Sequence, residues 1–181
     1  MDEAHETGLI GGVEKREIRI VDYDPRWPAK FQTHAELISS ALDDRAVAIE
    51  HIGSTSVTGL AAKPIIDILL VVEHSEDEAS YLARLEAAGY TLRVREPEFH
   101  EHRMLRTPEL DVHVHVYSRG CPEIERYLTF RNRLRNNANN RQLYESTKRR
   151  LSAEDWSDMN EYADAKGEVI EGILAQAIGG A

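Results

Sequence analysis

The sequence predicts a protein of the α/β (α+β) class, in which a mixed sheet flanked by helices is followed by a C-terminal helical portion. Short stretches rich in Ile and Val alternate with helical patterns up to residue 118, whereas the rest of the chain shows helical patterns alone. At 181 residues the chain suffices for one substantial core but not for two large domains. We therefore expect a mobile acidic tail at residues 1–14, an α/β core at residues 15–118 and a helical region at residues 119–181 that packs on the core.

The first two thirds of the chain carry helical and extended patterns in alternation. Residues 15–21 alternate charged and apolar side chains, which indicates an edge strand or an extended arm. Asp24 and Pro25 suit the start of a helix, and Trp27 and Phe31 begin its apolar stripe, which favours core packing over a ligand role. Strands are expected at residues 46–52, 64–72, 90–95, 102–106 and 111–117, and a second helix from a capping box of Ser75 and Glu78 to Ala88.

The last third of the chain reads as helices. They are predicted over residues 122–136, 138–151 and 153–178. Ser152 would cap the last helix, which Gly167 could interrupt. Asp158, Tyr162 and Lys166 share one face of that helix, and their spacing favours a solvated or salt-bridged stripe over a ligand site.

Charge and cysteine content exclude several classes of protein. With 32 acidic and 22 basic residues the net charge is −10, so nothing attracts the whole chain to nucleic acid, and we expect no DNA partner. The single cysteine, Cys121, excludes an internal disulfide and a cysteine-rich zinc site. Residues 1–12 lack the apolar segment of a signal peptide, and the longest apolar run, residues 65–72, is too short to span a bilayer. These features predict a cytoplasmic protein without a membrane partner, and they leave its oligomeric state open.

The stretch IEHIGSTSVTGLAAKPIIDILLVV, residues 49–72, combines a small polar loop with two apolar runs. Gly53, Ser54 and Thr55 allow a ligand to approach the loop backbone, and a helix that begins near residues 56–59 would aim its positive end at an anion. This loop is therefore a candidate phosphate site.

One acidic residue, Asp67, lies inside the second apolar run of this stretch. An unpaired carboxylate among Ile, Leu and Val side chains costs several kcal/mol of desolvation, so Asp67 requires a cationic partner. A metal ion is one candidate. Lys63, four residues earlier, is another, and it could equally contact a phosphate group.

Histidines occupy one face of the strand predicted at residues 111–117. His113 and His115 alternate with valines, so they point to the side opposite the apolar face. A turn of two or four residues would pair Arg106 with Asp111 and place His102 opposite His115, whereas a three-residue turn would scatter the histidines. Imidazoles beside a carboxylate suit a divalent transition metal, and a hydrogen-bonded sheet face without metal is an equally consistent interpretation.

The segment HIGSTSVTGLAAKPIID resembles the signature of the GrpB family, which is grouped with the nucleotidyltransferase superfamily. The resemblance extends through VHVHV and FRNRLR to Tyr144 and Lys148, and covers most of the chain after Glu17. It implies a nucleotidyltransferase-like sheet in which a Gly-Ser turn is followed, about a dozen residues later, by an aspartate, here Asp67. It also implies that the histidine-bearing strand lies beside the Asp67 strand.

This chain departs from the superfamily pattern in one respect. The second carboxylate, two residues after Asp67, is replaced by Leu69. By position, Asp111 or His113 would stand where the superfamily has a third carboxylate. If the strands are neighbours, Asp67, His113 and His115 could converge and supply what Leu69 lacks.

The function predicted from these features is that of a GrpB-family, nucleotidyltransferase-like enzyme that binds a phosphorylated substrate, expected to be a nucleoside triphosphate, together with a divalent metal. Mg²⁺ or Mn²⁺ is expected, with Zn²⁺ or another transition metal as alternatives. The candidate residues are Asp67, His113 and His115 for catalysis, the same three with His102 for the metal, and Gly53, Ser54, Thr55, Lys63, Arg131, Arg135 and Lys148 for phosphate. Two alternatives are a metal-dependent enzyme that acts on a small carboxylate or phosphorylated metabolite, and a catalytically silent binding module on the same fold.

Overall fold

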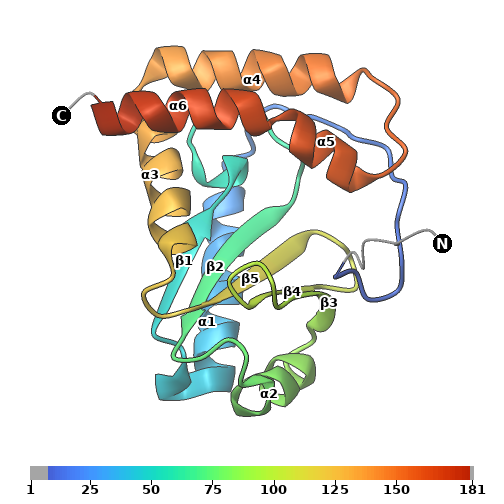
Figure 1. The fold of residues 1–181 in the computed structure, drawn as a ribbon, viewed down its shortest axis with the longest axis vertical. Coiled ribbons are helices and arrows are strands. Elements are labelled where there is room, and N and C mark those ends of the chain that lie inside the picture. The colour runs from blue at the N-terminus through green and yellow to red at the C-terminus, as the bar shows by residue number, and fades with distance from the viewer. Residues whose placement is uncertain (1–7, 180–181) are drawn as a thin grey trace.

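The computed structural model describes residues 8–179 and contains one five-stranded mixed sheet flanked by helices (Figure 1). The sheet order is β1-β2-β5-β4-β3, in which β2 and β5 run parallel and the other neighbours are antiparallel. The strands are β1 (Ala48–Ile52), β2 (Ile66–Val72), β3 (Thr91–Glu96), β4 (His102–Arg106) and β5 (Val112–Ser118). This architecture confirms the predicted fold class.

Helices cover both faces of the sheet. Two of them, α1 (Trp27–Leu42) and α2 (Leu82–Ala87), pack on one face. On the other side, α3 (Pro122–Asn136) covers the sheet near β1 and leads into α4 (Ala138–Ser152). Figure 1 shows α4 and α6 (Gly167–Gly179) side by side at one end of the molecule, with the short α5 (Met159–Ala165) before α6.

The alternation of side chains along β2 and β5 determines which residues each layer buries. Even-numbered residues of both strands face α1 and α2, while the odd-numbered Leu69, Val71 and Tyr117 face α3. Each fully buried Ile, Leu or Val contributes roughly 1.5–3 kcal/mol through removal of apolar surface from water. The even-numbered set comprises Ile66, Ile68, Leu70, Val72, Val112, Val114 and Val116. Asp67 lies on the odd-numbered face.

The N-terminal segment runs in contact with the sheet. Leu9 forms an antiparallel bridge with Val94 of β3, so residues 8–14 are held against a sheet edge, although they were expected to belong to a mobile tail. Residues 1–7 of that tail lie outside the described residues. Farther along, Val21 forms a single bridge with Ala62, which makes the preceding segment an extended arm and not a regular edge strand.

The predicted capping box is wrong. Ser75 is fully buried, and its hydroxyl donates to the backbone carbonyl of Glu101. The Glu78 carboxylate accepts hydrogen bonds from Arg95 and Arg103, which hold its pKa at about 2. With both side chains occupied by the sheet, α2 begins only at Leu82.

The long C-terminal helix predicted over residues 153–178 is divided into α5 and α6, with the break at Gly167 that the sequence allowed. The prediction that Ser152 caps the next helix is wrong, because Ser152 belongs to the end of α4. The cap is Asp158, whose Oδ1 accepts hydrogen bonds from the backbone N–H groups of Asn160 at 2.6 Å and Glu161 at 3.1 Å. Among residues 8–179 no helix is long and apolar enough to cross a bilayer.

The β4–β5 connection preserves the predicted histidine face but shifts its register. Arg106 pairs with His113, and not with Asp111, because Asp111 turns away to Lys30 and to the hydroxyl of Thr107. The shift is of two residues, so side chains keep their faces. His102 therefore lies on the side of the sheet that carries His113 and His115.

Candidate functional site

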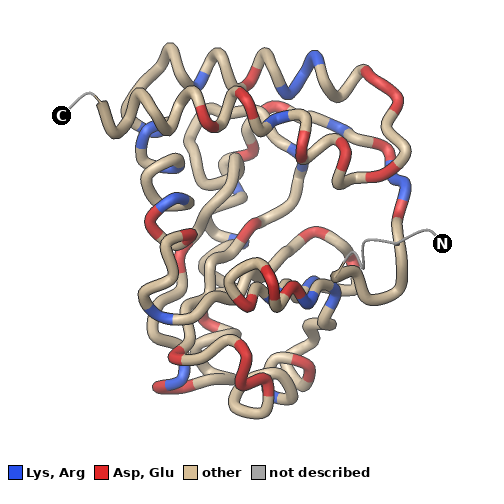
Figure 2. Tube along the Cα trace, in the orientation of Figure 1, with Lys and Arg blue, Asp and Glu red and all other residues tan. Residues whose placement is uncertain are grey.

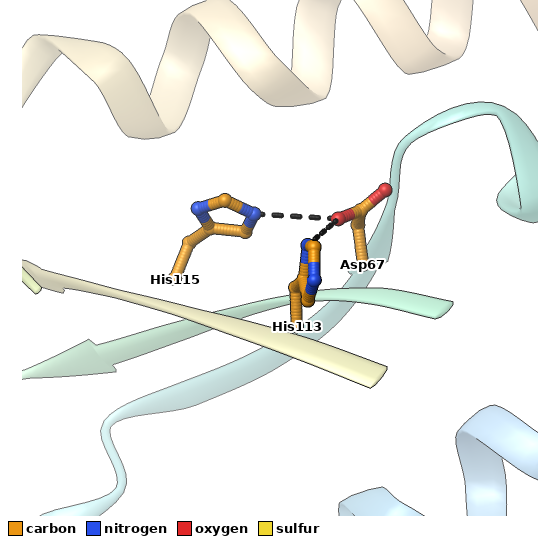
Figure 3. A group of neighbouring side chains, drawn as sticks. All are labelled: Asp67, His113 and His115. Carbon is orange, nitrogen blue, oxygen red and sulfur yellow. Dashed lines mark hydrogen bonds and ion pairs between the residues drawn. The ribbon is translucent and has the colours of Figure 1, made fainter. Parts of the chain in front are cut away.

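A carboxylate and two imidazoles meet where β2 and β5 run in parallel. Asp67 of β2 pairs in register with His113, and His115 follows two residues later on the same face. His115 Nε2 lies 3.3 Å, and His113 Nδ1 3.7 Å, from Asp67 Oδ1 (Figure 3). One nitrogen or oxygen atom from each residue lies within 4.8 Å of the others. This donor set fits a divalent transition metal ion.

His102 lies behind His115 and outside this group, although it was predicted to be a direct ligand. His102 Nε2 is 3.2 Å from His115 Nδ1, and His102 Nδ1 is 2.7 Å from Glu96 Oε2. Burial lowers the pKa of His102 and thus favours its neutral form. Because the Glu96 carboxylate can only accept, the proton of neutral His102 sits on Nδ1 and its Nε2 accepts.

The hydrogen bond between His102 and His115 determines which nitrogen of His115 faces Asp67. If His102 Nε2 accepts, His115 Nδ1–H donates to it, and His115 Nε2 then faces the Asp67 oxygen with a lone pair in the neutral ring or with an N–H group in the imidazolium. In the neutral form two acceptors are in contact, and a cation held between them would remove their repulsion. His113 Nε2 is also buried without a hydrogen-bond partner among the described residues, and burial lowers the pKa of His113 to about 4, which keeps this imidazole neutral. The unpartnered nitrogen of His113 is not the one that faces Asp67, so the fit to a divalent cation rests on the three converging donor atoms.

The glycine loop lies directly against the carboxylate. Gly53 has φ 70° and ψ −179°, a backbone region that is essentially restricted to glycine. A Cβ at this position would lie 2.6 Å from Asp67 Oδ2, which is closer than any van der Waals contact. The α-helix expected near residues 56–59 is absent, and a single 3₁₀ turn, Ser54–Ser56, stands there instead.

A cavity of about 320 Å³ opens beside Asp67 and His113. Its walls come from the glycine loop, from the segment before β2 and from the C-terminal helices. Besides the carboxylate and one imidazole, they include the loop residues Gly53, Ser54 and Thr55, the lysines Lys63, Lys148 and Lys166, and the tyrosines Tyr127, Tyr144 and Tyr162. This volume lies at the lower end of the range for small-molecule sites.

The three lysines bring concentrated positive charge to a chain that is acidic as a whole. Lys63 and Lys166 lie on the ring of Tyr162, with Nζ 5.1 and 4.7 Å from its centroid. Burial lowers the pKa of Lys63 to about 8, that of Lys148 to about 7, and also that of Lys166. Elsewhere basic and acidic positions are interspersed (Figure 2). Desolvated ammonium groups favour an anionic ligand, because it would compensate their charge.

The interpretation of Tyr162 and Lys166 as part of a solvated stripe is wrong, since both line the cavity and Tyr162 is fully buried. The sequence did contain a signal. Tyr144 and Lys148 have the same Tyr-x-x-x-Lys spacing on the preceding helix, and they line the same cavity. The repetition of one spacing on successive helices would have singled out both pairs.

The predicted phosphate-binding arginines do not line this cavity. Arg131 donates to Glu50 Oε2 at 2.8 Å and to the carbonyl of His51 at 3.0 Å. Arg135 donates twice to the carbonyl of Ser56, from Nε at 3.0 Å and from Nη2 at 2.8 Å. Both border a separate groove. In this position they hold β1 and the glycine loop against α3.

Lys148 and Leu69 also have packing partners that the sequence did not reveal. Lys148 Nζ donates to Ser54 Oγ at 2.8 Å and to the carbonyl of Ala61. Leu69, where the resemblance implied a second carboxylate, is fully buried in an apolar cluster with Ile52, Val71 and Tyr117. The sheet therefore has no polar environment there for a second acid.

The fold and the site define an α/β protein in which a candidate metal site borders a cation-lined cavity. The sequence profile described as "GrpB protein" matches residues 17–176, and the chain belongs to the GrpB family. It is 52% identical over 169 residues to a UPF0157 protein of Streptomyces coelicolor, a match that covers 93% of this chain and 89% of that one. A UPF0157 protein of Halalkalibacterium halodurans is 49% identical over 160 residues, with 88% and 82% covered.

The fold is similar to a solved structure of the same family. The crystal structure of conserved protein GrpB from Enterococcus faecalis superposes with a TM-score of 0.78 at 34% identity, and the match covers 88% of this chain and 96% of that chain. A shorter segment is 36% identical over 81 residues to a dephospho-CoA kinase of Mycolicibacterium paratuberculosis, which covers 43% of this chain and 20% of that protein.

Proposed function

We propose that the protein is a metal-dependent enzyme that acts on a phosphorylated small molecule. Asp67, His113 and His115 would hold one divalent cation, and Lys63 and Lys166 would receive the phosphate group. The observation that carries this proposal is the convergence of Asp67, His113 and His115 beside a cavity of buried lysines. The segment shared with a protein named dephospho-CoA kinase is consistent with a phosphorylated ligand.

The donor set indicates which metals fit. Two imidazoles and one carboxylate suit Mn²⁺, Fe²⁺ or Zn²⁺ better than Mg²⁺, which prefers oxygen ligands. A cation bound there supplies Lewis-acid polarisation of a phosphoryl oxygen and a lower pKa for bound water. The two lysines on Tyr162 would neutralise negative charge that develops on the substrate.

Nucleotidyl transfer is the second candidate, and the close approach of the Gly53 loop to Asp67 favours it. This approach matches the Gly-Ser turn and aspartate of the nucleotidyltransferase superfamily. Nucleoside triphosphates belong to the proposed substrate class. They can therefore be compared with smaller phosphorylated metabolites in the same binding experiment.

Metal content tests the proposal first. Protein purified without a histidine tag is expected to retain about one transition-metal ion per chain, and Asp67→Ala and His115→Ala are expected to lose it. The measurement is elemental mass spectrometry of the purified proteins. Asp111→Ala is the control, because that carboxylate directly precedes β5 but pairs with Lys30 and Thr107 outside the proposed metal group.

Ligand binding tests the second half of the proposal. ATP, GTP, CTP, UTP and small phosphorylated metabolites would be titrated by calorimetry with Mn²⁺ present. A phosphorylated ligand should bind to wild type and lose affinity in Asp67→Ala and in Lys166→Met. Metal-free wild-type protein and equal binding by all variants would together contradict the function proposed for this site.

His102 supports the metal site from behind, so His102→Phe is expected to weaken metal affinity about 10- to 100-fold, as loss of an outer-shell partner typically does. Phenylalanine retains a ring for the stack on Tyr117, whose centroid is 4.8 Å from that of His102. Competition with a fluorescent chelator measures the affinity. His34→Phe, a ring replacement beside Tyr90 and outside the metal group, should leave it unchanged. Unaltered affinity in His102→Phe would show that the imidazole chain does not orient His115.

A further inference from the structure

We propose that Ser54 and Lys148 form a nucleophile and general-base pair in this cavity, through which the protein transfers a phosphoryl group by way of a phosphoserine intermediate. The substrate class rests on the proposed function. The pair itself rests on its own geometry. Ser54 carries no assigned role in the metal group, and Lys148 was expected only to contact phosphate.

The two side chains lie in hydrogen-bond contact inside the cavity. Lys148 Nζ is 2.8 Å from Ser54 Oγ, a distance suitable for proton transfer between them. Ser54 lines the cavity directly after Gly53, and the Gly53 backbone lies against Asp67. The serine hydroxyl is thus presented beside the proposed metal ligands, where a substrate phosphorus would be held.

The surroundings of Lys148 favour its unprotonated form. Only 2% of Lys148 is exposed, and its Nζ lies 4.9 Å from the ring centroid of Tyr144. Burial is the main cause that lowers its pKa to about 7, so at neutral pH about half of the molecules carry a free amine. The charged groups that act on it are Lys166, Arg149 and Lys63, which lower the pKa, and Glu145, which raises it.

In the proposed step a phosphoryl group moves from an oxygen of the substrate to the Ser54 hydroxyl. Ser54 Oγ attacks the phosphorus, the Oγ–P bond forms, and the bond from phosphorus to the leaving oxygen breaks. The serine proton passes to Lys148 Nζ, while the leaving oxygen, which lies opposite Ser54 in an in-line displacement, takes a proton from solvent and departs as an alcohol or, from a nucleoside triphosphate, as a diphosphate. Water or an acceptor alcohol then takes the phosphoryl group and restores the Ser54 hydroxyl.

The alternative to a catalytic role is a structural one, in which Lys148 stabilises the loop by donating hydrogen bonds to Ser54 and to the Ala61 carbonyl. Arginine separates the two roles. It retains a positive charge and several N–H donors, but it cannot lose a proton in a protein. Lys148→Arg therefore preserves a fastening cation and removes the base.

The test uses an uncharged alkyl fluorophosphonate, which forms a stable bond to activated serines. Intact-mass spectrometry and peptide mapping should find one adduct on Ser54 of the wild-type protein. The labelling rate should rise from about pH 6 to about pH 8 with a midpoint near 7, the pKa of the lysine. It should fall about 100-fold in Lys148→Arg, the lower end of what general bases contribute.

Two controls separate reactivity from folding and from the metal. Ser56→Ala, in the same loop but outside this cavity, should be labelled like wild type. Thermal melting would verify that Lys148→Arg is folded, and Lys148→Met provides a second variant if it is not. Labelling of Ser54 is independent of bound metal, so it can succeed where the metal proposal fails. Absence of a Ser54 adduct, or equal labelling of folded Lys148→Arg, would overturn the pair.

Discussion

Gly53→Ala is expected to lower the free energy of unfolding by about 3 kcal/mol, at the upper end of the cost of one strained backbone residue. It should also abolish metal retention. The backbone of Gly53 occupies a region that alanine avoids, and the new Cβ would lie 2.6 Å from Asp67 Oδ2 and 3.0 Å from Asp67 Cβ. Either the loop or the carboxylate must move. Urea denaturation measures the first effect, and elemental mass spectrometry the second.

Gly59→Ala is the matched control. Gly59 has φ 80°, close to the 70° of Gly53, but no atom lies within 4 Å of a Cβ built on it. This variant should lose only about 1 kcal/mol, from backbone strain alone, and retain its metal. If both variants lost the same stability and kept the metal, contact between the loop and Asp67 would not matter for the site.

Leu69→Asp is expected to destabilise the protein by about 4 kcal/mol or to prevent folding, because an unpaired charge would be buried in an apolar cluster. This substitution introduces a carboxylate two residues after Asp67, as in the nucleotidyltransferase pattern that the sequence resembles. Leu69 has no exposed surface, so neither water nor a cation compensates an acid there. The variant should therefore bind no additional metal. Urea denaturation and metal analysis are the measurements.

Leu69→Met provides the comparison, since it conserves volume and polarity and should cost less than about 1.5 kcal/mol. A stable Leu69→Asp protein that held a second cation would show that the cluster opens to solvent. In that case the two-carboxylate arrangement of the superfamily would be only one substitution away in this chain.

Short-range patterns in the sequence predicted much of the fold and the shared face of two histidines. The period-two alternation of residues 111–117 placed His113 and His115 on one face, and the structure bears this out despite a register shift of two residues. The family resemblance correctly implied that this strand lies beside Asp67. Capping was less predictable, because Ser75 and Glu78 are used by distant parts of the sheet.

The sequence could not reveal which side chains share the cavity. Arg131 and Arg135 have the right chemistry for phosphate, yet Arg131 binds Glu50 and a carbonyl of β1, and Arg135 binds a carbonyl of the loop. Lys63, Lys148 and Lys166 come from three separate segments and meet only after the C-terminal helices pack over the sheet.

The sequence alone predicted which residues share a strand face, because the direction of a side chain follows from the backbone conformation of its own segment. It did not predict the assembly of the lysine-lined cavity, because contacts and pKa values depend on atoms that lie a few ångströms away in space and up to a hundred residues away in the chain. The residues that face Asp67 thus follow from its neighbouring strand, whereas the charge of the space beside it follows from how the helices pack.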